Sequence, residues 1–255
     1  MINKFFVQSP ALANTETAAK TGIKKETEKI ITFLKKMKLI VTGATGMAGA
    51  EVIRQAITDD TISEIIALVR RPLEINHPKI TTVIHHDFLN YDAVKNYFIG
   101  CDTCIWCLGI SQLQVSKEQY AVITYDYTIA AAKAMVAVNP AIHFVFLSGN
   151  GADRTEKSRV RFAKLKGKTE NALLQSGLKK ITIARPDAIW PKHKNKNAPL
   201  AYKLAFPFYP LVEIFAPSKI IGAVQLAKAL LYLAKNAGEK NTYENMELRM
   251  LGSKD

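Results

Sequence analysis

The chain has 255 residues, of which 48% are hydrophobic and 22% are charged. This composition is ordinary for a globular protein, so it excludes a disordered, collagen-like or coiled-coil chain. The 35 Lys and Arg residues outnumber the 22 Asp and Glu residues and give a formal net charge of +13. Such an excess favours an anionic partner, which could be nucleic acid, a membrane surface or a phosphorylated ligand.

Targeting and redox signals are weak along the chain. No uncharged apolar run reaches about 18 residues, so no membrane-spanning helix is expected. The apolar patch at 5–7 is too short for the core of a signal peptide. The 3 cysteines lie close together and give no disulfide framework. We therefore expect a cytoplasmic protein.

The first 36 residues differ from the rest of the chain. Residues 8–22 show no apolar period, whereas 24–36 could form a basic helix with one apolar face. We expect 1–36 to be a leader that is loosely ordered or forms a peripheral helix, and both a dispensable and a functional leader stay open. The fold is predicted to begin at Met37 and to occupy 37–255 as one domain.

From Met37 on, apolar stretches typical of buried strands alternate with helical patterns. Strands that are apolar on both faces and separated by helices form a parallel sheet covered on both sides. Right-handed connections make this a doubly wound α/β sheet of the Rossmann type. Residues from about 192 to 255 are expected to form a small C-terminal cap that shapes the substrate site. Strands are predicted at 38–42, 64–69, 80–84, 103–108, 142–147 and 180–184, and helices at 47–57, 91–98, 117–138, 160–176 and 219–236.

The most informative segment follows the first strand and reads Val41-Thr-Gly43-Ala-Thr-Gly46-Met-Ala-Gly49. Gly43 allows a tight turn, Gly46 lets the backbone approach a pyrophosphate, and Gly49 lets the next helix pack closely on the strand. The helix start presents free N–H groups and the positive end of its dipole to phosphate. Because the motif stands between a strand and a helix, it predicts a dinucleotide-binding site.

The second strand ends at Val69 and is followed by Arg70 and Arg71. Sites selective for NAD carry a carboxylate here, which binds the ribose 2′-hydroxyl. Two guanidinium groups suit a 2′-phosphate instead, so we predict NADP(H) in preference to NAD(H). The alternative is that both arginines are only solvated. After the third strand, Asp87 is expected to bind the adenine amino group, with Phe88 beside the ring.

The spacing of Cys101, Cys104 and Cys107 suggests a metal or iron–sulfur site. These residues fall on or beside a strand, where positions three apart point to opposite faces and lie roughly 10 Å apart. They therefore cannot converge on one ion, and we predict buried thiols and no metal site. At the end of this strand, Leu108 and Gly109 are expected to pass beneath the cofactor.

Four further segments follow the glycine motif in order: Cys107-Leu-Gly-Ile-Ser111, Leu147-Ser-Gly-Asn-Gly-Ala-Asp153, Lys164-Leu-Lys-Gly-Lys-Thr-Glu170 and Ala184-Arg-Pro186. With this ordered set, the chain resembles the short-chain dehydrogenase/reductase superfamily, and most of all its atypical members grouped with the Tat-interacting-protein oxidoreductases. The resemblance runs from Met37 to about Pro191 and more loosely to the end.

The resemblance implies a catalytic serine after the fifth strand and a Tyr-x-x-x-Lys pair on the next helix. In the family, the tyrosine exchanges a proton with the substrate oxygen, the lysine lowers the pKa of the tyrosine and holds the nicotinamide ribose, and the serine polarises the carbonyl. These roles fall to Ser148 and Lys166 in this chain. Phe162 stands where the family has tyrosine, and a phenyl ring has no proton to exchange.

Another group must therefore replace the tyrosine, or the reductase step is absent. The candidates for this group are Tyr120, Tyr125, Tyr127, Asp187 and His193. Each also has an ordinary structural explanation: the tyrosines could pack in the core or on the helix surface, the aspartate could cap a turn, and the histidine could be solvated. The residues predicted to bind the cofactor are Gly43, Thr45, Gly46, Met47, Gly49, Arg70, Arg71, Asp87, Phe88, Leu108, Gly109, Lys166 and Pro186.

Basic residues cluster at 24–38, 154–168 and 179–203. The second cluster borders the expected substrate entrance, where it would attract NADP(H) or an anionic substrate. The basic residues could instead bind nucleic acid, but the sequence has no recognisable nucleic-acid-binding module. Association with a membrane surface is a weaker alternative. The basic residues could also form a solvated surface that binds no partner. We expect an NADPH-dependent oxidoreductase with an unknown small-molecule substrate. The alternatives are a non-catalytic dinucleotide-binding regulatory or interaction protein and an isomerase resembling the sugar epimerases.

Overall fold

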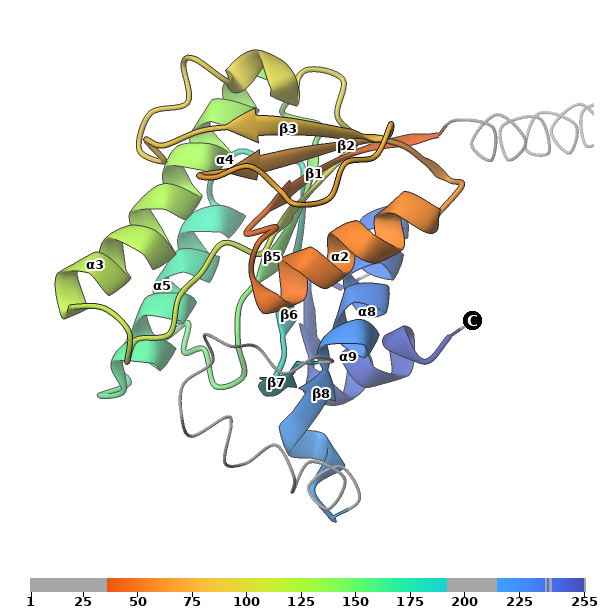
Figure 1. Ribbon diagram of the computed structural model, residues 1–255. Helices are drawn as coiled ribbons and strands as arrows, with labels where there is room; N and C mark the ends of the chain where they lie inside the picture. The colour runs from red at the N-terminus through yellow and green to blue at the C-terminus, as the bar shows by residue number, and fades with distance from the viewer. Residues whose placement is uncertain (1–35, 192–214, 237, 239, 255) are drawn as a thin grey trace, which may run out of the picture. The chain divides into compact units, whose positions relative to one another are not determined.

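A seven-stranded sheet forms the centre of the computed structural model, which describes residues 36–191, 215–236, 238 and 240–254 (Figure 1). All neighbouring strands are parallel, in the order β3-β2-β1-β4-β5-β6-β9. This confirms the doubly wound, Rossmann-type sheet predicted from the sequence. The strands are β1 (Met37–Thr42), β2 (Ile62–Val69), β3 (Ile80–Ile84), β4 (Thr103–Trp106), β5 (His143–Leu147), β6 (Lys180–Arg185) and β9 (Thr242–Glu244).

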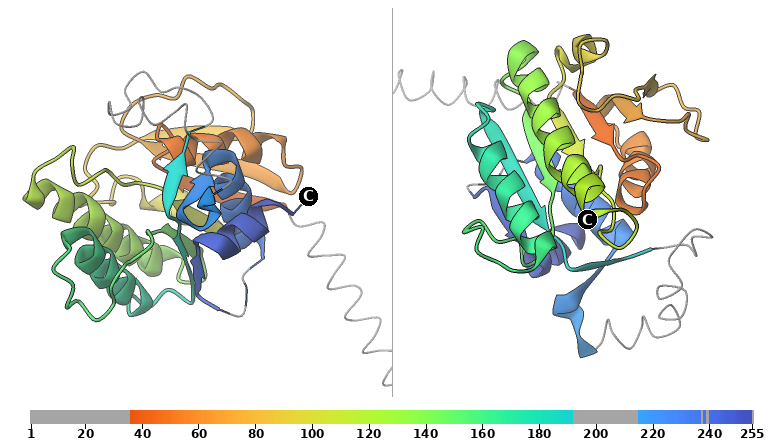
Figure 2. Two further views of the ribbon diagram at one scale, coloured as in Figure 1. Left: turned by 90° about the horizontal axis from the view of Figure 1, so that it is seen from below. Right: turned by 90° about the vertical axis from the view of Figure 1, so that its left-hand side faces the viewer.

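Helices cover both faces of the sheet, as Figures 1 and 2 show. The alternation of side chains along β1 explains the two layers. Leu39 and Val41 are buried in the core on one face of the sheet, whereas Ile40 is buried in the core on the other face. Burying an aliphatic side chain of this size contributes about 2 kcal/mol, so each face retains its own helices. One face carries α2 (Met47–Thr58), α8 (Ala223–Lys235) and α9 (Asn245–Gly252), and the other carries α3 (Lys117–Ala121), α4 (Tyr127–Val138) and α5 (Arg161–Leu174).

The chain divides into two compact units, Met1–Lys36 and Met37–Asp255. The second unit begins at the methionine where the sequence predicts the fold to begin. The predicted leader lies almost entirely outside the described residues.

The predicted helix at 91–98 is largely absent, and only the short 3₁₀ helix η1 (Lys95–Phe98) forms there. The side chain of Asn90 accepts the N–H of Asp92 at 2.8 Å, and such local bonds compete with a helix. Tyr91 is buried against the rings of His85 and Phe98, which fixes the segment as an irregular connection.

The C-terminal part also differs from the expected cap. The predicted helix at 219–236 starts only at Ala223, because Ile220–Gly222 forms β8 and pairs with β7 (Ala188–Trp190). From there on the described chain belongs to the main fold, since α8 packs on the sheet and β9 extends it beside β6. The first part of the expected cap, 192–214, lies outside the described residues.

The predicted helix at 117–138 is continuous but contains a wider π-helical turn, η2 (Val122–Asp126), between α3 and α4. Within the described part of the chain, Lys117–Val138 is the one helix long and apolar enough to cross a membrane, although the sequence analysis expects none. Length and composition alone are weak evidence, because core helices pass the same test. In this helix Ala131, Ala132 and Met135 are fully buried.

The carboxyl ends of β1 and β4 lie side by side in the middle of the sheet. On one side of β1 the order continues to β2 and β3, and on the other it continues from β4 to β5 and β6. In open α/β sheets, ligands bind in the crevice outside this reversal point. The fold therefore directs attention to the carboxyl edge.

Candidate functional site

The glycine turn after β1 is shaped by close backbone approaches. Gly43 has φ +64°, and a Cβ there would lie 2.5 Å from the carbonyl oxygen of Cys107 at the end of β4. A Cβ on Gly49 would clash with the carbonyl oxygen of Gly43, whereas one on Gly46 would lie 3.1 Å from the same oxygen. Gly43 and Gly49 are thus required by the fold, while exposed Gly46 leaves open surface above the turn.

Helix α2 starts directly behind this turn. Its first residue is Met47, its N-cap is Gly46, and no side chain bonds to its first N–H groups. Thr45, Gly46 and Met47 are all exposed. An uncapped helix start with its positive dipole end attracts an anion, and the missing Cβ of glycine lets that anion approach the backbone. The residues present therefore fit a dinucleotide pyrophosphate.

The end of β4 forms the neighbouring wall of the turn. The N–H of Leu108 donates to Oγ1 of Thr42 at 3.2 Å, which joins the ends of β4 and β1. Gly109 is exposed, and nothing lies within 4 Å of the position its Cβ would take. The structure thus brings Leu108 and Gly109 beside the glycine turn, where the sequence analysis expects the cofactor to pass.

Arg70 and Arg71 lie at the carboxyl end of β2, next to the end of β1. Both are exposed, and neither forms an ion pair with any carboxylate that the structure describes. Asp87 follows β3 and is also exposed, with Oδ1 accepting the N–H of Leu89 at 3.0 Å. These side chains are exposed at the carboxyl edge of the sheet, the edge at which open α/β sheets bind their ligands.

The expected position of Phe88 beside the adenine ring is wrong. Its ring is only 2% exposed and packs against His85, Tyr91 and Tyr127, with a centroid distance of 5.6 Å to Tyr127. The ring therefore belongs to the core beneath α4 and cannot lie beside an adenine. After β3, Asp87 is exposed while Phe88 is turned into the core.

Ser148 and Glu170 form a buried hydrogen bond at the end of β5. The Ser148 hydroxyl donates to Oε1 of Glu170 at 2.6 Å, and Glu170 is fully buried. Arg154 Nε donates to Oε2 of Glu170 at 2.7 Å, and Arg185 binds both carboxylate oxygens. Arg185 also pairs with Glu244 at 3.1 Å, so two cations balance two carboxylates. The network joins β5, α5, β6 and the end of β9.

Lys166 lies one turn before Glu170 on α5 and is also buried. Its Nζ donates to the carbonyl oxygen of Leu147 at 3.0 Å and lies 4.7 Å from the ring centre of Phe146. Burial lowers the pKa of Lys166 to about 8, although Glu170 acts in the opposite direction. The ammonium group of Lys166 therefore lies at the carboxyl end of β5.

Phe162 fills the place where the family tyrosine is expected. Its ring lies so close to Gly149 that a Cβ on this glycine would clash with Cζ. Gly149 directly follows Ser148, so the surface between the serine and the helix is closed by carbon atoms. In this structure neither Phe162 nor Gly149 supplies a proton-transferring group.

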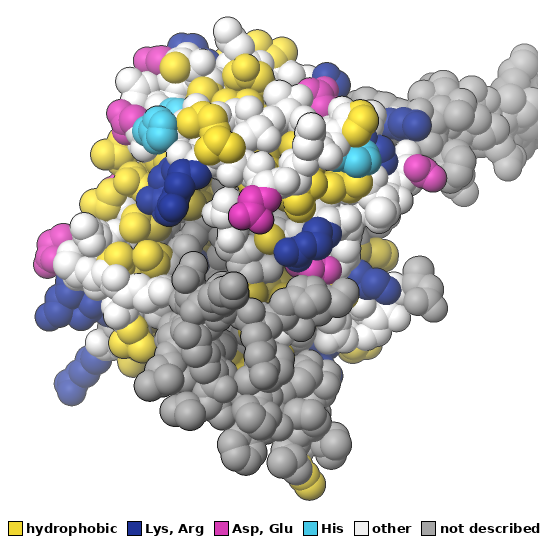
Figure 3. Space-filling view, viewed as in Figure 1, with side chains coloured by type: hydrophobic (Ala, Val, Ile, Leu, Met, Phe, Trp, Pro, Cys, Tyr) yellow, Lys and Arg dark blue, Asp and Glu magenta, His cyan; other side chains and the backbone are white. Residues whose placement is uncertain are grey.

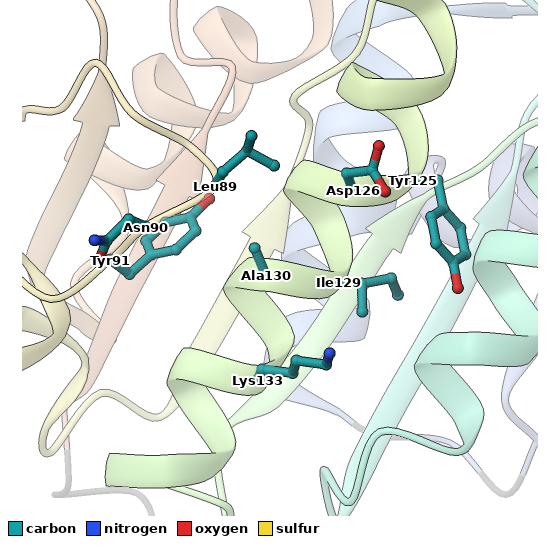
Figure 4. Close-up of a pocket in the computed structure, with 8 residues that line it drawn as sticks. All are labelled: Leu89, Asn90, Tyr91, Tyr125, Asp126, Ile129, Ala130 and Lys133. Carbon is teal, nitrogen blue, oxygen red and sulfur yellow. The ribbon is translucent and has the colours of Figure 1, made fainter. Parts of the chain in front are cut away.

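The three tyrosine candidates have other contacts. Tyr120 is 1% exposed, and burial raises its pKa. The Tyr125 ring lies 4.7 Å from Nζ of Lys168, and Tyr127 packs on Phe88. Tyr125 also lines a surface groove of about 560 Å³ (Figure 4). This groove is lined by Leu89, Asn90, Tyr91, Tyr125, Asp126, Ile129, Ala130 and Lys133.

Asp187, another candidate, does lie at the carboxyl edge. It is partly exposed, and its Oδ1 accepts Nδ2 of Asn150 at 2.8 Å. Pro186 precedes it, is buried, and accepts the N–H of Asn150 with its carbonyl oxygen at 2.8 Å. The remaining candidate, His193, lies outside the described residues.

The cysteines occupy both sides of the sheet. Cys104 is buried in the core on the side of α4, and Cys107 packs against the core on the side of α2. Burial raises the pKa of Cys101 and of Cys107 to about 12. No group of three or more His, Cys, Asp or Glu side chains within the described residues could hold a metal ion.

The basic cluster at 154–168 separates into internal and external residues. Arg154 and Lys166 take part in the buried contacts described above. Figure 3 shows Lys and Arg side chains at the lower left, over the end of the molecule where α3 and α5 begin. The exposed cations of the cluster are Lys157, Arg159, Arg161, Lys164 and Lys168.

Sequence reasoning missed the partners that hold the site together. Glu170 was recognised only as part of a motif, and Arg154 only as part of a basic cluster. Arg185 stood next to Pro186 without a role, and Asn150 was not singled out. One signal in the sequence could have indicated these partners: Glu170 lies on the face of its helix that is expected to be buried. A buried carboxylate needs charged or hydrogen-bonding partners.

The chain matches a family model described as NAD(P)H-binding over residues 43–203. A match of this extent, together with the glycine turn and the open start of α2, means that the chain belongs to this family of NAD(P)H-binding Rossmann proteins. The resemblance to the short-chain dehydrogenase/reductase superfamily is thereby confirmed at the level of fold and cofactor class.

Individual relatives are more distant. Leucinostatins biosynthesis cluster protein T of Purpureocillium lilacinum is 29% identical over 142 residues, covering 54% of this chain and 52% of that protein. The match thus spans about half the length of that relative. "Protein FMP52, mitochondrial" of Lodderomyces elongisporus is 26% identical over 227 residues, covering 84% of this chain and 93% of that protein. A short chain dehydrogenase of Burkholderia cenocepacia J2315, solved with NADP, has a TM-score of 0.59 over 85% of this chain and 91% of that chain. At 14% identity, this structural likeness shows a common fold and nothing more.

Proposed function

We propose that the protein is an NADP(H)-dependent oxidoreductase acting on a small molecule. The observation that carries this proposal is the buried ammonium group of Lys166 behind the carboxyl end of β5. Its only hydrogen-bond partner among the described residues is the carbonyl oxygen of Leu147, so two N–H donors are left for a ligand. A buried charge with a shifted pKa at the carboxyl edge of such a sheet is typical of functional sites.

Each part of the edge then has a task in cofactor binding. The start of α2 would hold the pyrophosphate, Arg70 and Arg71 the 2′-phosphate, and Lys166 the hydroxyls of the nicotinamide ribose. The bound nicotinamide supplies hydride chemistry. The protein residues orient it, and Phe162 with Gly149 excludes water from one side of the crevice.

The cofactor preference is tested by titrating NADPH and NADH separately by isothermal titration calorimetry. We expect NADPH to bind more tightly than NADH, and Arg70→Ala with Arg71→Ala to weaken NADPH roughly 10- to 100-fold while NADH changes little. Lys133→Ala, which removes an exposed cation from α4, serves as the matched control. Tighter binding of NADH by the wild type would contradict the preference for NADP(H).

Turnover is tested by following NADPH absorbance with acetone, cyclohexanone and benzaldehyde, and NADP⁺ reduction with the corresponding alcohols. Turnover by the wild type that disappears in Lys166→Met supports the oxidoreductase. Tight NADPH binding without turnover of any of these compounds contradicts it.

A second candidate function is favoured by the contact between Phe162 and Gly149. Carbon atoms occupy the positions where the family exchanges protons, as expected for a dinucleotide-binding regulatory or interaction protein. In that case NADPH binds the wild type without turnover, and activity emerges only in Phe162→Tyr. Equal turnover by the wild type and Phe162→Tyr excludes this second function. The cytoplasmic location stays a prediction, which cell fractionation would test.

A further inference from the structure

The backbone of Asp187 is held by a buried amide. Its N–H donates to Oδ1 of Asn245 at 3.0 Å, and Asn245 is 3% exposed. Nδ2 of Asn245 donates to the carbonyl oxygens of Ser218 and Ile220 at 2.9 and 3.2 Å. Because this amide is engaged by three backbone groups, it fixes the chain directly after β6. The carboxylate of Asp187 therefore projects from a rigid position.

The side chain of Asp187 is held as well. Nδ2 of Asn150 donates to its Oδ1 at 2.8 Å, while the N–H of Asn150 donates to the carbonyl oxygen of Pro186. Asn150 follows Gly149, and Gly149 touches the ring of Phe162. A short series of contacts thus links Asp187 to the position where the family hydroxyl is missing.

The second carboxylate oxygen is available to a ligand. Within the described part of the chain, Oδ2 of Asp187 has no hydrogen-bond donor, and no Lys or Arg forms an ion pair with the group. The side chain is partly exposed at the carboxyl end of β6. By contrast, the proton of Ser148 is directed to Glu170, and Tyr120 is buried.

We propose that Asp187 is the catalytic base of this site and takes the role of the absent tyrosine hydroxyl. This inference rests on the oxidoreductase function proposed above. The substrate class is a secondary alcohol and the corresponding ketone. The alcohol carbon gives a hydride to NADP⁺, the O–H bond breaks, and its proton moves to Oδ2 of Asp187 as the C=O bond forms. Ketone, NADPH and neutral Asp187 result, and Asp187 then releases the proton to water.

The reverse reaction uses the same groups. Protonated Asp187 gives its proton to the alkoxide oxygen that forms as the ketone receives a hydride from NADPH. Asn150 acts as a positioning residue, because its amide holds Oδ1 and leaves Oδ2 to accept the proton of the substrate.

The test compares Asp187→Asn, Asp187→Ala and wild type in the oxidation of isopropanol and cyclohexanol by NADP⁺. General base catalysis accounts for roughly 100- to 10,000-fold in rate, so we expect kcat of Asp187→Asn to fall by about 100-fold or more. The affinity for NADP⁺, measured by calorimetry, and the melting temperature should stay unchanged. Added formate should restore part of the activity of Asp187→Ala, because it supplies a carboxylate to the emptied space.

The matched control is Asp60→Asn, which removes an exposed carboxylate from the connection before β2 at the opposite edge of the sheet. An equal loss in Asp60→Asn, or a kcat for Asp187→Asn close to that of the wild type, would overturn the role of Asp187 while the oxidoreductase stands. An Asp187→Ala variant that formate fails to restore would also contradict it. If the wild type turns over none of the alcohols or ketones, the proposed oxidoreductase and this inference fall together.

Discussion

The hydroxyl group of Ser148 donates its proton to the fully buried carboxylate of Glu170 over 2.6 Å. A hydroxyl has one proton, so Ser148 cannot polarise a substrate carbonyl while this bond exists. In this arrangement Ser148 fastens the end of β5 to α5. The catalytic role implied by the family resemblance would require the bond to Glu170 to break first.

Glu170 is therefore expected to matter first for stability. Glu170→Gln removes the buried negative charge between Arg154 and Arg185, so that Arg154 loses this ion pair and Arg185 keeps only the one with Glu244. Breaking a buried ion pair in this way costs about 3–5 kcal/mol. Urea unfolding followed by circular dichroism measures the change. Glu244→Gln, at the exposed side of the same network, is the control and should cost less than about 1 kcal/mol.

Lys166, in contrast to Glu170, is expected to lower the stability of the folded protein near neutral pH. Burial lowers its pKa from 10.5 to about 8, so at higher pH the folded protein releases this proton before the unfolded chain does. The unfolded chain then binds more protons, and the free energy of unfolding rises with pH between about 8 and 10.5. From about pH 7 to pH 9 this group adds roughly 1 kcal/mol.

Lys166→Met should abolish that rise and should be more stable than the wild type near neutral pH by about 1–3 kcal/mol, because no charge is buried. Its affinity for NADPH should fall. Lys164→Met, an exposed lysine on the same helix, should keep both the rise and the affinity. A Lys166→Met variant with unchanged stability at every pH would show that the ammonium group is not desolvated.

The features that could be predicted from the sequence are those that depend on near neighbours in the chain. The glycine turn needs only the order of a strand, three glycines and a helix, and Arg70 and Arg71 directly follow β2. The burial of both faces of β1 was readable from its apolar run Leu39-Ile-Val41. In each case the physical cause lies within about one turn or one strand of the residue concerned.

The site contacts that could not be predicted join distant segments. Ser148 and Glu170 are 22 residues apart, and Asn150 and Asp187 are 37 apart. No local pattern states which buried carboxylate meets which guanidinium group. The position of Phe88 could not be predicted either, although only neighbouring residues are involved. A shift of one residue after β3 determines whether a side chain is exposed, like Asp87, or buried in the core, like Phe88.

The glycines of the turn should respond differently to alanine. In Gly49→Ala the new methyl group meets the carbonyl oxygen of Gly43, so α2 must move away, and we expect a loss of about 2–3 kcal/mol in unfolding free energy. Gly46→Ala places its methyl group 3.1 Å from the same oxygen, on the exposed side. Its stability should change by less than about 1 kcal/mol, while its NADPH affinity falls roughly 10-fold because the methyl group occupies the phosphate surface.

Urea unfolding and NADPH titration of both variants separate the two effects. Gly100→Ala is a useful control, because open space surrounds its position but its φ is +71°, so it reports backbone strain alone. A Gly46→Ala variant that binds NADPH as tightly as the wild type would contradict the placement of the pyrophosphate above this residue.

His143, at the start of β5, should make the protein sensitive to acid. Its Nε2 lies 2.8 Å from Oγ1 of Thr182, and burial, together with the nearby charge of Lys180, lowers its pKa to about 4. The folded-state pKa lies below the unfolded value of about 6.5, so the unfolded chain binds more protons in between. The stability contributed by neutral His143 is complete above about pH 6.5 and is lost as the pH falls toward 4.

Between about pH 7 and pH 5 the wild type should lose about 2 kcal/mol through this group. His143→Gln keeps a polar partner for Thr182 but does not titrate, so its stability should fall less over the same interval. His86→Gln, which changes an exposed histidine after β3, should follow the wild type. Parallel unfolding curves for His143→Gln and the wild type at both pH values would show that His143 accepts a proton as readily in the folded protein as in the unfolded chain.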